Sequence, residues 1–221
     1  MAESHLPHEH DHDQDHDGAP HAEIVTHEPA PEHVLLERAL RELLIEKGVF
    51  SGDDVRRQID LTESRGEATG ARLVARAWVD AEFKQLLLED AKSAATRLGL
   101  DVSNTPALVV LENTPRLHHL VVCTLCSCYP KAILGIPPAW YKSREYRARA
   151  VKDPRGVLRE FGTALADEVE LRVVDSTADM RYLVLPLRPA GSEGASESDL
   201  ARLVTRDSMI GVSQPRPPAA D

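Results

Sequence analysis

The chain has 221 residues, 42% of them hydrophobic, and a formal net charge of -10. This length suits one domain with a tail, and no apolar run approaches the roughly 20 residues that a membrane span needs. Residues 1–33 hold nine of the 36 acidic residues and no Lys or Arg, so 27 acidic and 26 basic residues remain. A nearly neutral folded part disfavours nucleic-acid binding. We therefore expect neither a nucleic-acid partner nor a membrane partner.

The N-terminal stretch is acidic and rich in histidine. Eight of the ten histidines lie there, at His5, His8, His10, His12, His16, His21, His27 and His33. Too few apolar residues accompany them to pack, so we expect residues 1–32 to form a disordered tail. Such a tail either only solvates the protein or gathers divalent metals weakly through imidazole. It does not resemble a basic and apolar secretory signal, so we expect a cytoplasmic protein.

Helical spacing of apolar residues predicts two helices after this tail. The first follows Val34 and ends at Gly48, a typical C-terminal cap. Asp53 is expected to cap the second, which runs to about Arg65. Two glycines, Gly66 and Gly70, are expected to interrupt the helical pattern afterwards.

A third, longer helix is expected to open at Asp80 and to end at Gly99, with apolar residues on one face. We therefore assign residues 33–100 to a helical arm. Residues 101–212 form the expected metal-binding catalytic domain, and residues 213–221 a flexible C-terminal tail.

Short aliphatic runs in the second half predict strands. They occupy residues 108–111 and 120–122, and alternation over residues 168–174 predicts another strand. A turn at residues 176–179 leads to residues 180–185, so the last two strands are expected to form a hairpin. Two short helices are also predicted, one from Asp153-Pro154 to Gly162 and one from Ser196 and Asp199 through Leu203.

All three cysteines lie within six residues, at Cys123, Cys126 and Cys128. In a cytosolic protein this spacing favours metal or redox chemistry over a structural disulfide. A zinc site needs a fourth ligand, for which His118 and His119 are the nearest candidates. An iron–sulfur cluster usually needs a fourth cysteine, which the chain lacks.

The segment Cys126-Ser127-Cys128 offers another kind of site. If the amide nitrogens of Ser127 and Cys128 lose their protons, they and the two cysteine sulfurs form a square of four donors. Cys123 can then supply an axial thiolate, which leaves the opposite position open for catalysis. Amidate and thiolate donors favour a small, highly charged ion such as cobalt(III) or iron(III), and the donors alone leave that choice open.

The segment 122–130, VCTLCSCYP, resembles the signature of nitrile hydratase alpha subunits. The similarity covers about residues 34–212. It continues through Leu134-Gly135, Pro137-Pro138, Trp140-Tyr141-Lys142, Glu160-Phe161-Gly162, the segment 181–186 and the segment 204–211.

The resemblance implies a fold, a metal and an activity. The fold is α+β, with an N-terminal helical arm followed by a four-layered α-β-β-α domain. Iron members of the family have Ser at the position of Thr124, so one cobalt(III) per chain is implied and iron(III) is the second choice. The metal ligands are Cys123, Cys126, Ser127 and Cys128. The implied enzyme is a hydro-lyase that converts a small nitrile to an amide.

The resemblance also implies oxidised cysteines and partner proteins. The residue at Cys126 becomes a sulfinic acid and the residue at Cys128 a sulfenic acid, so these two are the expected catalytic residues, while Cys123 stays a thiolate. A beta-type subunit closes the site with arginines, in a heterodimer or heterotetramer. An activator or metallochaperone protein is the other expected partner.

Two positions depart from the family pattern: Lys131-Ala132 replaces Trp-Pro, and Ala195 replaces a Trp. Thiocyanate hydrolase, whose metal-bearing subunit has a basic residue at the position of Lys131, is therefore an alternative. A non-catalytic cobalt-binding alpha-like protein is another. We expect Lys131 to lie at the rim of a pocket for nitriles, Tyr141 to serve packing, and Asp175 to be a cap or an interface ion pair.

Overall fold

The computed structural model describes residues 30–218, and residues 1–29 and 219–221 lie outside the described part. Most of the expected tail therefore falls outside it. The first helix, α1 (Pro31–Glu46), begins three residues before Val34 because a proline suits the first turn of a helix. Gly48, with φ of +69°, follows its end as predicted.

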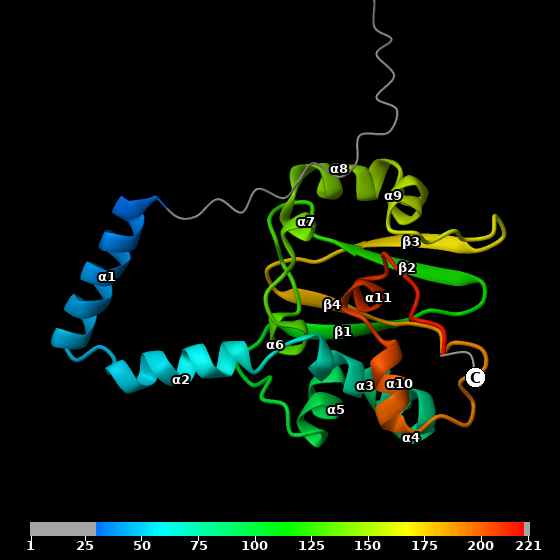
Figure 1. The fold of residues 1–221 in the computed structure, drawn as a ribbon, viewed down its shortest axis with the longest axis horizontal. Coiled ribbons are helices and arrows are strands. Elements are labelled where there is room, and N and C mark those ends of the chain that lie inside the picture. The colour runs from blue at the N-terminus through cyan, green and yellow to red at the C-terminus, as the bar shows by residue number, and fades with distance from the viewer. Residues whose placement is uncertain (1–29, 219–221) are drawn as a thin grey trace, which may run out of the picture.

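Helices α1 and α2 (Gly52–Glu63) form an arm that extends away from the rest of the molecule (Figure 1). Neither helix has a buried residue. The prediction that Asp53 caps α2 is wrong, because Ser51 is the cap and forms a reciprocal capping box with Asp54. Asp53 instead lies in the first turn.

Helix α3 (Glu67–Val79) confirms the expected interruption at Gly66 and overturns the one at Gly70. Gly66 precedes the helix, and Gly70 lies inside it. A Cβ atom at Gly70 would meet Sδ of Met209 at 2.6 Å and Cδ2 of Leu134 at 2.7 Å. The glycine therefore permits close packing of α3 on the core and does not break the helix.

The predicted helix from Asp80 to Gly99 is two helices, α4 (Ala81–Glu89) and α5 (Ala91–Arg97). Asp80 caps α4 as predicted, and Asp90 caps α5 by accepting a hydrogen bond from the backbone N–H of Ser93. Helices α3, α4 and α5 contribute residues to the hydrophobic core. The exposed arm in the structure thus consists of α1 and α2. The domain boundaries given from the sequence, at residues 32, 100 and 212, stay predictions.

Two parallel pairs of strands form the centre of the molecule. Strand β1 (Ala107–Glu112) pairs with β4 (Met180–Leu185), and β2 (Leu117–Val122) pairs with β3 (Glu170–Asp175). The predicted hairpin of the last two strands is therefore wrong. Strand β3 lies in the sheet of β2 and strand β4 in the sheet of β1, so the turn between β3 and β4 leads from one sheet to the other.

The short helices complete the fold. They are α6 (Lys131–Leu134), α7 (Ala139–Lys142), α8 (Arg144–Lys152), α9 (Pro154–Glu160), α10 (Glu197–Leu203) and α11 (Arg206–Ile210). The predicted helices that became α9 and α10 are confirmed, with Asp153 and Ser196 as their caps.

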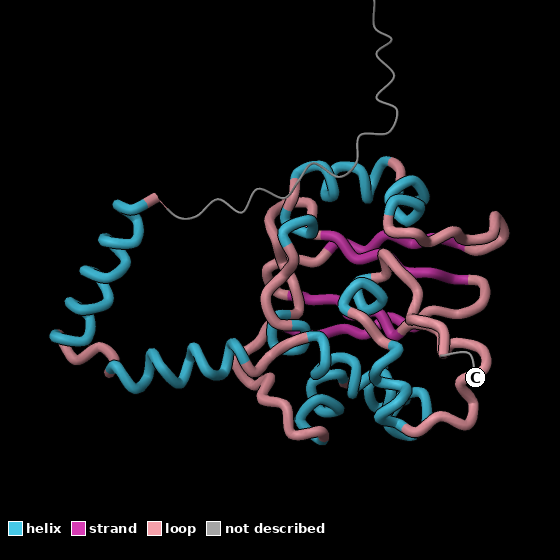
Figure 2. Tube along the Cα trace, in the orientation of Figure 1, coloured by secondary structure: helices cyan, strands magenta, loops and turns pink. Residues whose placement is uncertain are grey.

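Helices cover both sides of the paired sheets (Figures 1 and 2). Helices α8 and α9 lie on the side of β2 and β3, whereas α4 and α5 contact β1. This order agrees with the expected α+β class and its α-β-β-α layers. In the described part of the chain, no helix is both long and apolar enough to cross a membrane.

Candidate metal centre

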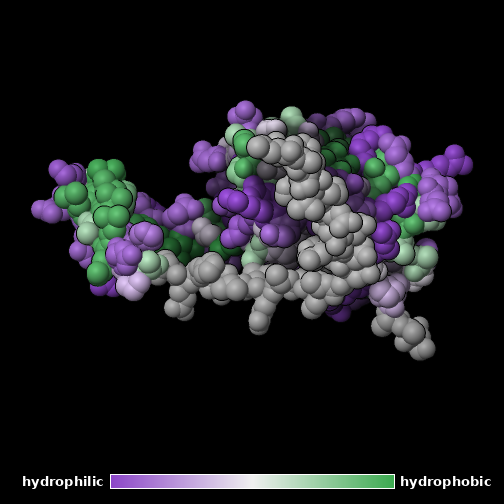
Figure 3. Space-filling view, turned by 90° about the horizontal axis from the view of Figure 1, so that it is seen from above, coloured by the Kyte–Doolittle hydropathy of each residue, from purple (hydrophilic) through white to green (hydrophobic). Residues whose placement is uncertain are grey.

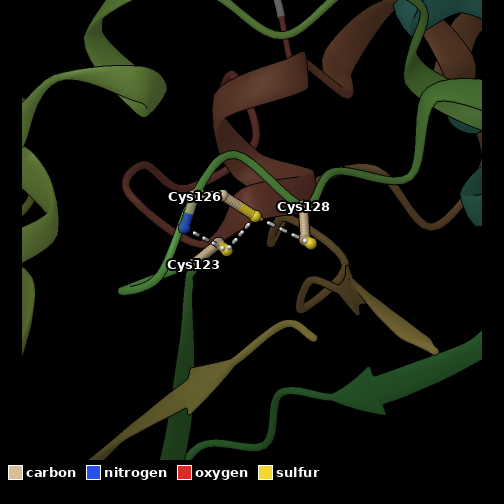
Figure 4. A group of neighbouring side chains, drawn as sticks. All are labelled: Cys123, Cys126 and Cys128. Carbon is tan, nitrogen blue, oxygen red and sulfur yellow. Dashed lines mark hydrogen bonds between the residues drawn. The ribbon is translucent and has the colours of Figure 1, made fainter. Parts of the chain in front are cut away.

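The three cysteines lie on one loop directly after β2, residues 123–130, which we call the cysteine loop. Their Sγ atoms all lie within 4.8 Å of one another. Sγ of Cys126 is 3.6 Å from that of Cys123 and 3.3 Å from that of Cys128, and the backbone N–H of Cys126 donates to Sγ of Cys123 (Figure 4). The loop therefore turns back on itself and gathers its three sulfurs at one place.

Residues distant in sequence hold the cysteine loop in place. Asp175, at the end of β3, accepts hydrogen bonds from the backbone N–H of Thr124 at 3.0 Å and from its hydroxyl. Tyr141 of α7 donates its hydroxyl to the backbone oxygen of Cys128 at 2.8 Å. Both ends of the loop are thus fixed to the body of the protein, which suits a preorganised site.

The sulfurs differ in exposure and in acidity. Cys123 is fully buried and Cys128 nearly so, whereas Cys126 is exposed. Hydrogen bonds from the sulfurs of Cys128 and Cys123 lower the pKa of Cys126, and the backbone N–H of Ser127 lowers it further. Burial raises the pKa of Cys128 to about 12. In the metal-free loop Cys126 therefore loses its proton before Cys128.

The donors of this loop fit a metal ion. Three sulfurs converge on a small volume, and the backbone N–H groups of Ser127 and Cys128 both act on the Cys126 sulfur. A cation among them would release the proton that burial holds on Cys128. Among the described residues, no other group of three or more His, Cys, Asp or Glu side chains brings its ligand atoms together in this way.

A cavity of about 420 Å³ opens over the cysteine loop. Cys126, Ser127 and Cys128 line it, and the exposed Lys131 lies at its wall together with Arg181. A small molecule in this cavity would contact the segment Cys126-Ser127-Cys128 of the loop.

The histidines nearest to the motif do not join it. Both His118 and His119 are buried, because the neighbouring strand and the C-terminal segment cover β2, and neither belongs to the group of metal-binding side chains that the cysteines form. Nε2 of His118 lies 2.7 Å from the carbonyl oxygen of Gly211, and Oδ1 of Asn113 accepts a hydrogen bond from the backbone N–H of His119. Burial lowers the pKa of both imidazoles. They serve the core as neutral hydrogen-bonding groups.

A family model described as nitrile hydratase, alpha chain, matches residues 32–213. The chain belongs to this family. The family contains the low-molecular weight cobalt-containing nitrile hydratase subunit alpha of Rhodococcus rhodochrous, which is 54% identical over 183 residues, 82% of this chain and 88% of that protein. The thiocyanate hydrolase subunit gamma of Thiobacillus thioparus is 47% identical over 201 residues, 86% of this chain and 83% of that protein.

Solved structures of the family share the fold. Recombinant thiocyanate hydrolase with partially modified cobalt centres has a TM-score of 0.79 at 46% identity, over 88% of this chain and 96% of that one. A double mutant of the Fe-type nitrile hydratase from Comamonas testosteroni Ni1 has a TM-score of 0.76 at 44% identity, over 86% of this chain and 94% of that one. The expected family and fold class are therefore confirmed.

Proposed function

We propose that this chain is the catalytic alpha subunit of a cobalt nitrile hydratase, which adds water to nitriles and yields amides. The observation that carries the proposal is the convergence of three cysteine sulfurs, within 4.8 Å, on a loop that lines a cavity. The metal ligands would be the sulfurs of Cys123, Cys126 and Cys128 and the amide nitrogens of Ser127 and Cys128. One cobalt(III) per chain agrees with the cobalt-containing relatives, and iron(III) is second because an Fe-type structure is also similar.

When bound, the metal would supply a Lewis acid that polarises the carbon–nitrogen triple bond. The residues of the chain would then direct water to the carbon atom. We propose that molecular oxygen oxidises Cys126 to a sulfinic acid and Cys128 to a sulfenic acid, whose oxygen acts as the nucleophile or as the base toward water. Asp175 and Tyr141 would keep these oxygens in place, because they anchor the two ends of the loop.

The exposed apolar surface of the arm argues for a partner subunit. Leu35, Leu36 and Leu40 of α1 are 66%, 67% and 54% exposed, and apolar side chains gather at the end of the arm in Figure 3. A surface of this kind marks a protein contact. We propose that a beta-type subunit covers it, in a heterodimer or heterotetramer that also closes the cavity. An activator protein would load the cobalt, and three free thiols agree with a cytoplasmic location.

The direct test is nitrile hydration by the assembled protein. The chain is produced with its beta-type subunit in cobalt-supplemented medium, and amide formation from propionitrile is followed. We expect turnover by the complex and none by the chain alone, because the open cavity needs its partner. A cobalt-loaded complex that hydrates no nitrile and no thiocyanate would contradict the proposal and favour a non-catalytic cobalt-binding protein.

Thiocyanate hydrolysis is the second candidate. Its specific support is the 47% identity to the thiocyanate hydrolase subunit gamma and the place of Lys131 at the cavity. The same complex assayed with thiocyanate distinguishes the two activities.

A further inference from the structure

The start of β2 carries two adjacent histidines, His118 and His119, which share one hydrogen-bonding partner. The side chain of Asn113 lies between them, with Nδ2 at 3.2 Å from Nδ1 of His118 and Oδ1 at 3.1 Å from Nδ1 of His119. Nε2 of His118 lies 2.7 Å from the carbonyl oxygen of Gly211. The three side chains are only 4% to 6% exposed, so these contacts take the place of water.

Fixed backbone groups decide which atoms of this cluster carry protons. The backbone N–H of His119 donates to Oδ1 of Asn113 at 2.8 Å, so the Asn113 amide cannot turn over without setting two donors against each other. The NH2 group of Asn113 therefore faces Nδ1 of His118, which must accept. The carbonyl oxygen of Gly211 only accepts, so Nε2 of His118 must donate. The cluster thus fits a neutral His118 with its proton on Nε2.

A second proton on His118 has no place in this arrangement. Nδ1 would become a donor that faces the NH2 group of Asn113, which leaves a buried donor without an acceptor. Burial lowers the pKa of His118, and the hydrogen bond to Gly211 opposes this effect. His119 differs, because its Nδ1 already lies beside an acceptor, Oδ1 of Asn113. The fold therefore excludes the charged form of His118 more strictly than that of His119.

Residues 211–218, which we call the C-terminal strap, follow α11 and lie against this cluster (Figure 1). A cavity of about 530 Å³ has His118 and Asn113 on its wall, together with residues 186–190 and residues 213–217 of the strap except Arg216. Water in this cavity can carry a proton to His118. A charged imidazole that moved toward this water would press on the strap.

Few backbone contacts hold the strap apart from the contact with His118. Val212 and Ser213 donate their backbone N–H groups to Asp207, at 3.0 and 3.4 Å. Further along, the backbone N–H of Arg216 donates to the carbonyl oxygen of Leu203 at 2.7 Å. The hydrogen bond between His118 and Gly211 therefore fixes the start of the strap to β2.

The charged groups around the cluster offer no acidic partner to His118. Arg188 lines the same cavity, and within the described residues no Asp or Glu does. Strand β3 contributes Arg172, which lowers the pKa of His119 after the larger effect of burial, and Glu170, which raises it. The other charged residues on elements next to the cluster are Glu112, which pairs with Lys84, and Arg206 and Asp207 of α11.

We propose that Asn113, His118 and Gly211 form an acid-sensitive latch, which holds the strap on β2 while His118 is neutral and releases it when His118 binds a second proton. The charged imidazole then reaches the water of the cavity, and the strap uncovers β2. This strand ends at the cysteine loop, so the latch links proton concentration to the packing behind the candidate metal centre.

Linkage sets the direction of the effect. The closed latch holds the pKa of His118 below its ordinary value of about 6.5, whereas the open latch lets it return to that value. The closed form is therefore favoured above about pH 6.5, and it loses this advantage as the pH falls further. A single histidine can change the equilibrium by up to about tenfold for each pH unit below that point.

Hydrogen–deuterium exchange of the full chain in its assembled complex tests the latch. Protection of the backbone N–H groups of residues 212–216 is measured at about pH 7.5 and about pH 5, relative to the same peptide in the unfolded chain at each pH. Residues 144–160 of α8 and α9 serve as an internal reference. The variants are His118→Gln, Asn113→Asp and the matched control His119→Gln.

In the natural protein, we expect the protection of residues 212–216 to fall by about tenfold or more in acid, and to return at about pH 7.5. His118→Gln removes the titrating group, so its protection should change by less than about threefold. His119→Gln keeps the latch and should behave as the natural protein does. Asn113→Asp replaces the NH2 group by an acceptor of the same shape, which can bind a charged His118, so its strap should be protected in acid at least as well as at about pH 7.5.

Asn113→Asp also keeps the test decisive if His118→Gln fails to fold. An equal loss of protection in acid for Asn113→Asp and the natural protein would overturn the latch. So would unchanged protection of the natural strap at about pH 5, or a loss in residues 144–160 as large as that in the strap, which would mean that the whole domain unfolds.

Discussion

A Cys126→Ser chain, produced with its partner and with cobalt, is expected to hold less than about a tenth of the cobalt of the natural chain after treatment with a chelator. Cys126 lies between the other two sulfurs, 3.6 Å from that of Cys123 and 3.3 Å from that of Cys128. Its loss removes one corner of the proposed square and breaks the chelate ring that joins its sulfur to the amide nitrogen of Ser127. Elemental analysis of the desalted complex gives the ratio of cobalt to chain.

Ser127→Ala is the matched control for this measurement. The proposed ligand at that position is the backbone nitrogen, so removal of the hydroxyl should leave about one cobalt per chain, as in the natural protein. Full cobalt occupancy in Cys126→Ser under the same challenge would mean that the proposed donor set is wrong.

Gly211→Ala is expected to destabilise the protein by about 3 kcal/mol or more, or to prevent its folding. Gly211 has a φ of +87°, and a Cβ atom there would lie 1.9 Å from the backbone oxygen of His119 and 3.3 Å from Cα of Leu120. These are backbone atoms of β2, which leads into Cys123 and cannot move aside cheaply. Thermal unfolding of the assembled protein measures the effect, which corresponds to a fall of about 6 °C or more.

Gly162→Ala separates the clash from the backbone conformation. Gly162 has a similar φ of +75°, but no atom lies within 4 Å of the position of its Cβ. Only the left-handed conformation should disfavour this alanine, by about 1 to 2 kcal/mol. Equal melting temperatures of the two variants would show that close packing of Gly211 on β2 contributes nothing.

The sequence predicted local structure better than packing. The starts of α9 and α10 depend on a cap within a few residues, Asp153 and Ser196, and both were predicted correctly. The hairpin of β3 and β4 was wrong because each strand pairs with a strand about 50 to 70 residues earlier in the chain. Gly70 was misread for a related reason: its close neighbours, Met209 and Leu134, are distant in sequence.

The same distinction applies to the candidate metal centre. The cysteine loop was predictable because its three sulfurs lie within six residues, so their spacing alone brings them together. Asp175 and Tyr141, expected to be a cap or ion pair and a packing residue, instead anchor the loop. The contact of Asp175 with the loop depends on the parallel pairing of β2 with β3, which sets Val122 opposite Asp175. The sequence did not predict this pairing.

The most direct test of the proposed centre is the mass of the native chain from the assembled complex, measured together with its cobalt content. We predict one cobalt per chain and an addition of about 48 Da, three oxygens, relative to the chain produced without cobalt. Peptide mapping should place two oxygens on Cys126, one on Cys128 and none on Cys123. An active, cobalt-loaded complex whose chain carries three unmodified thiols would contradict the account.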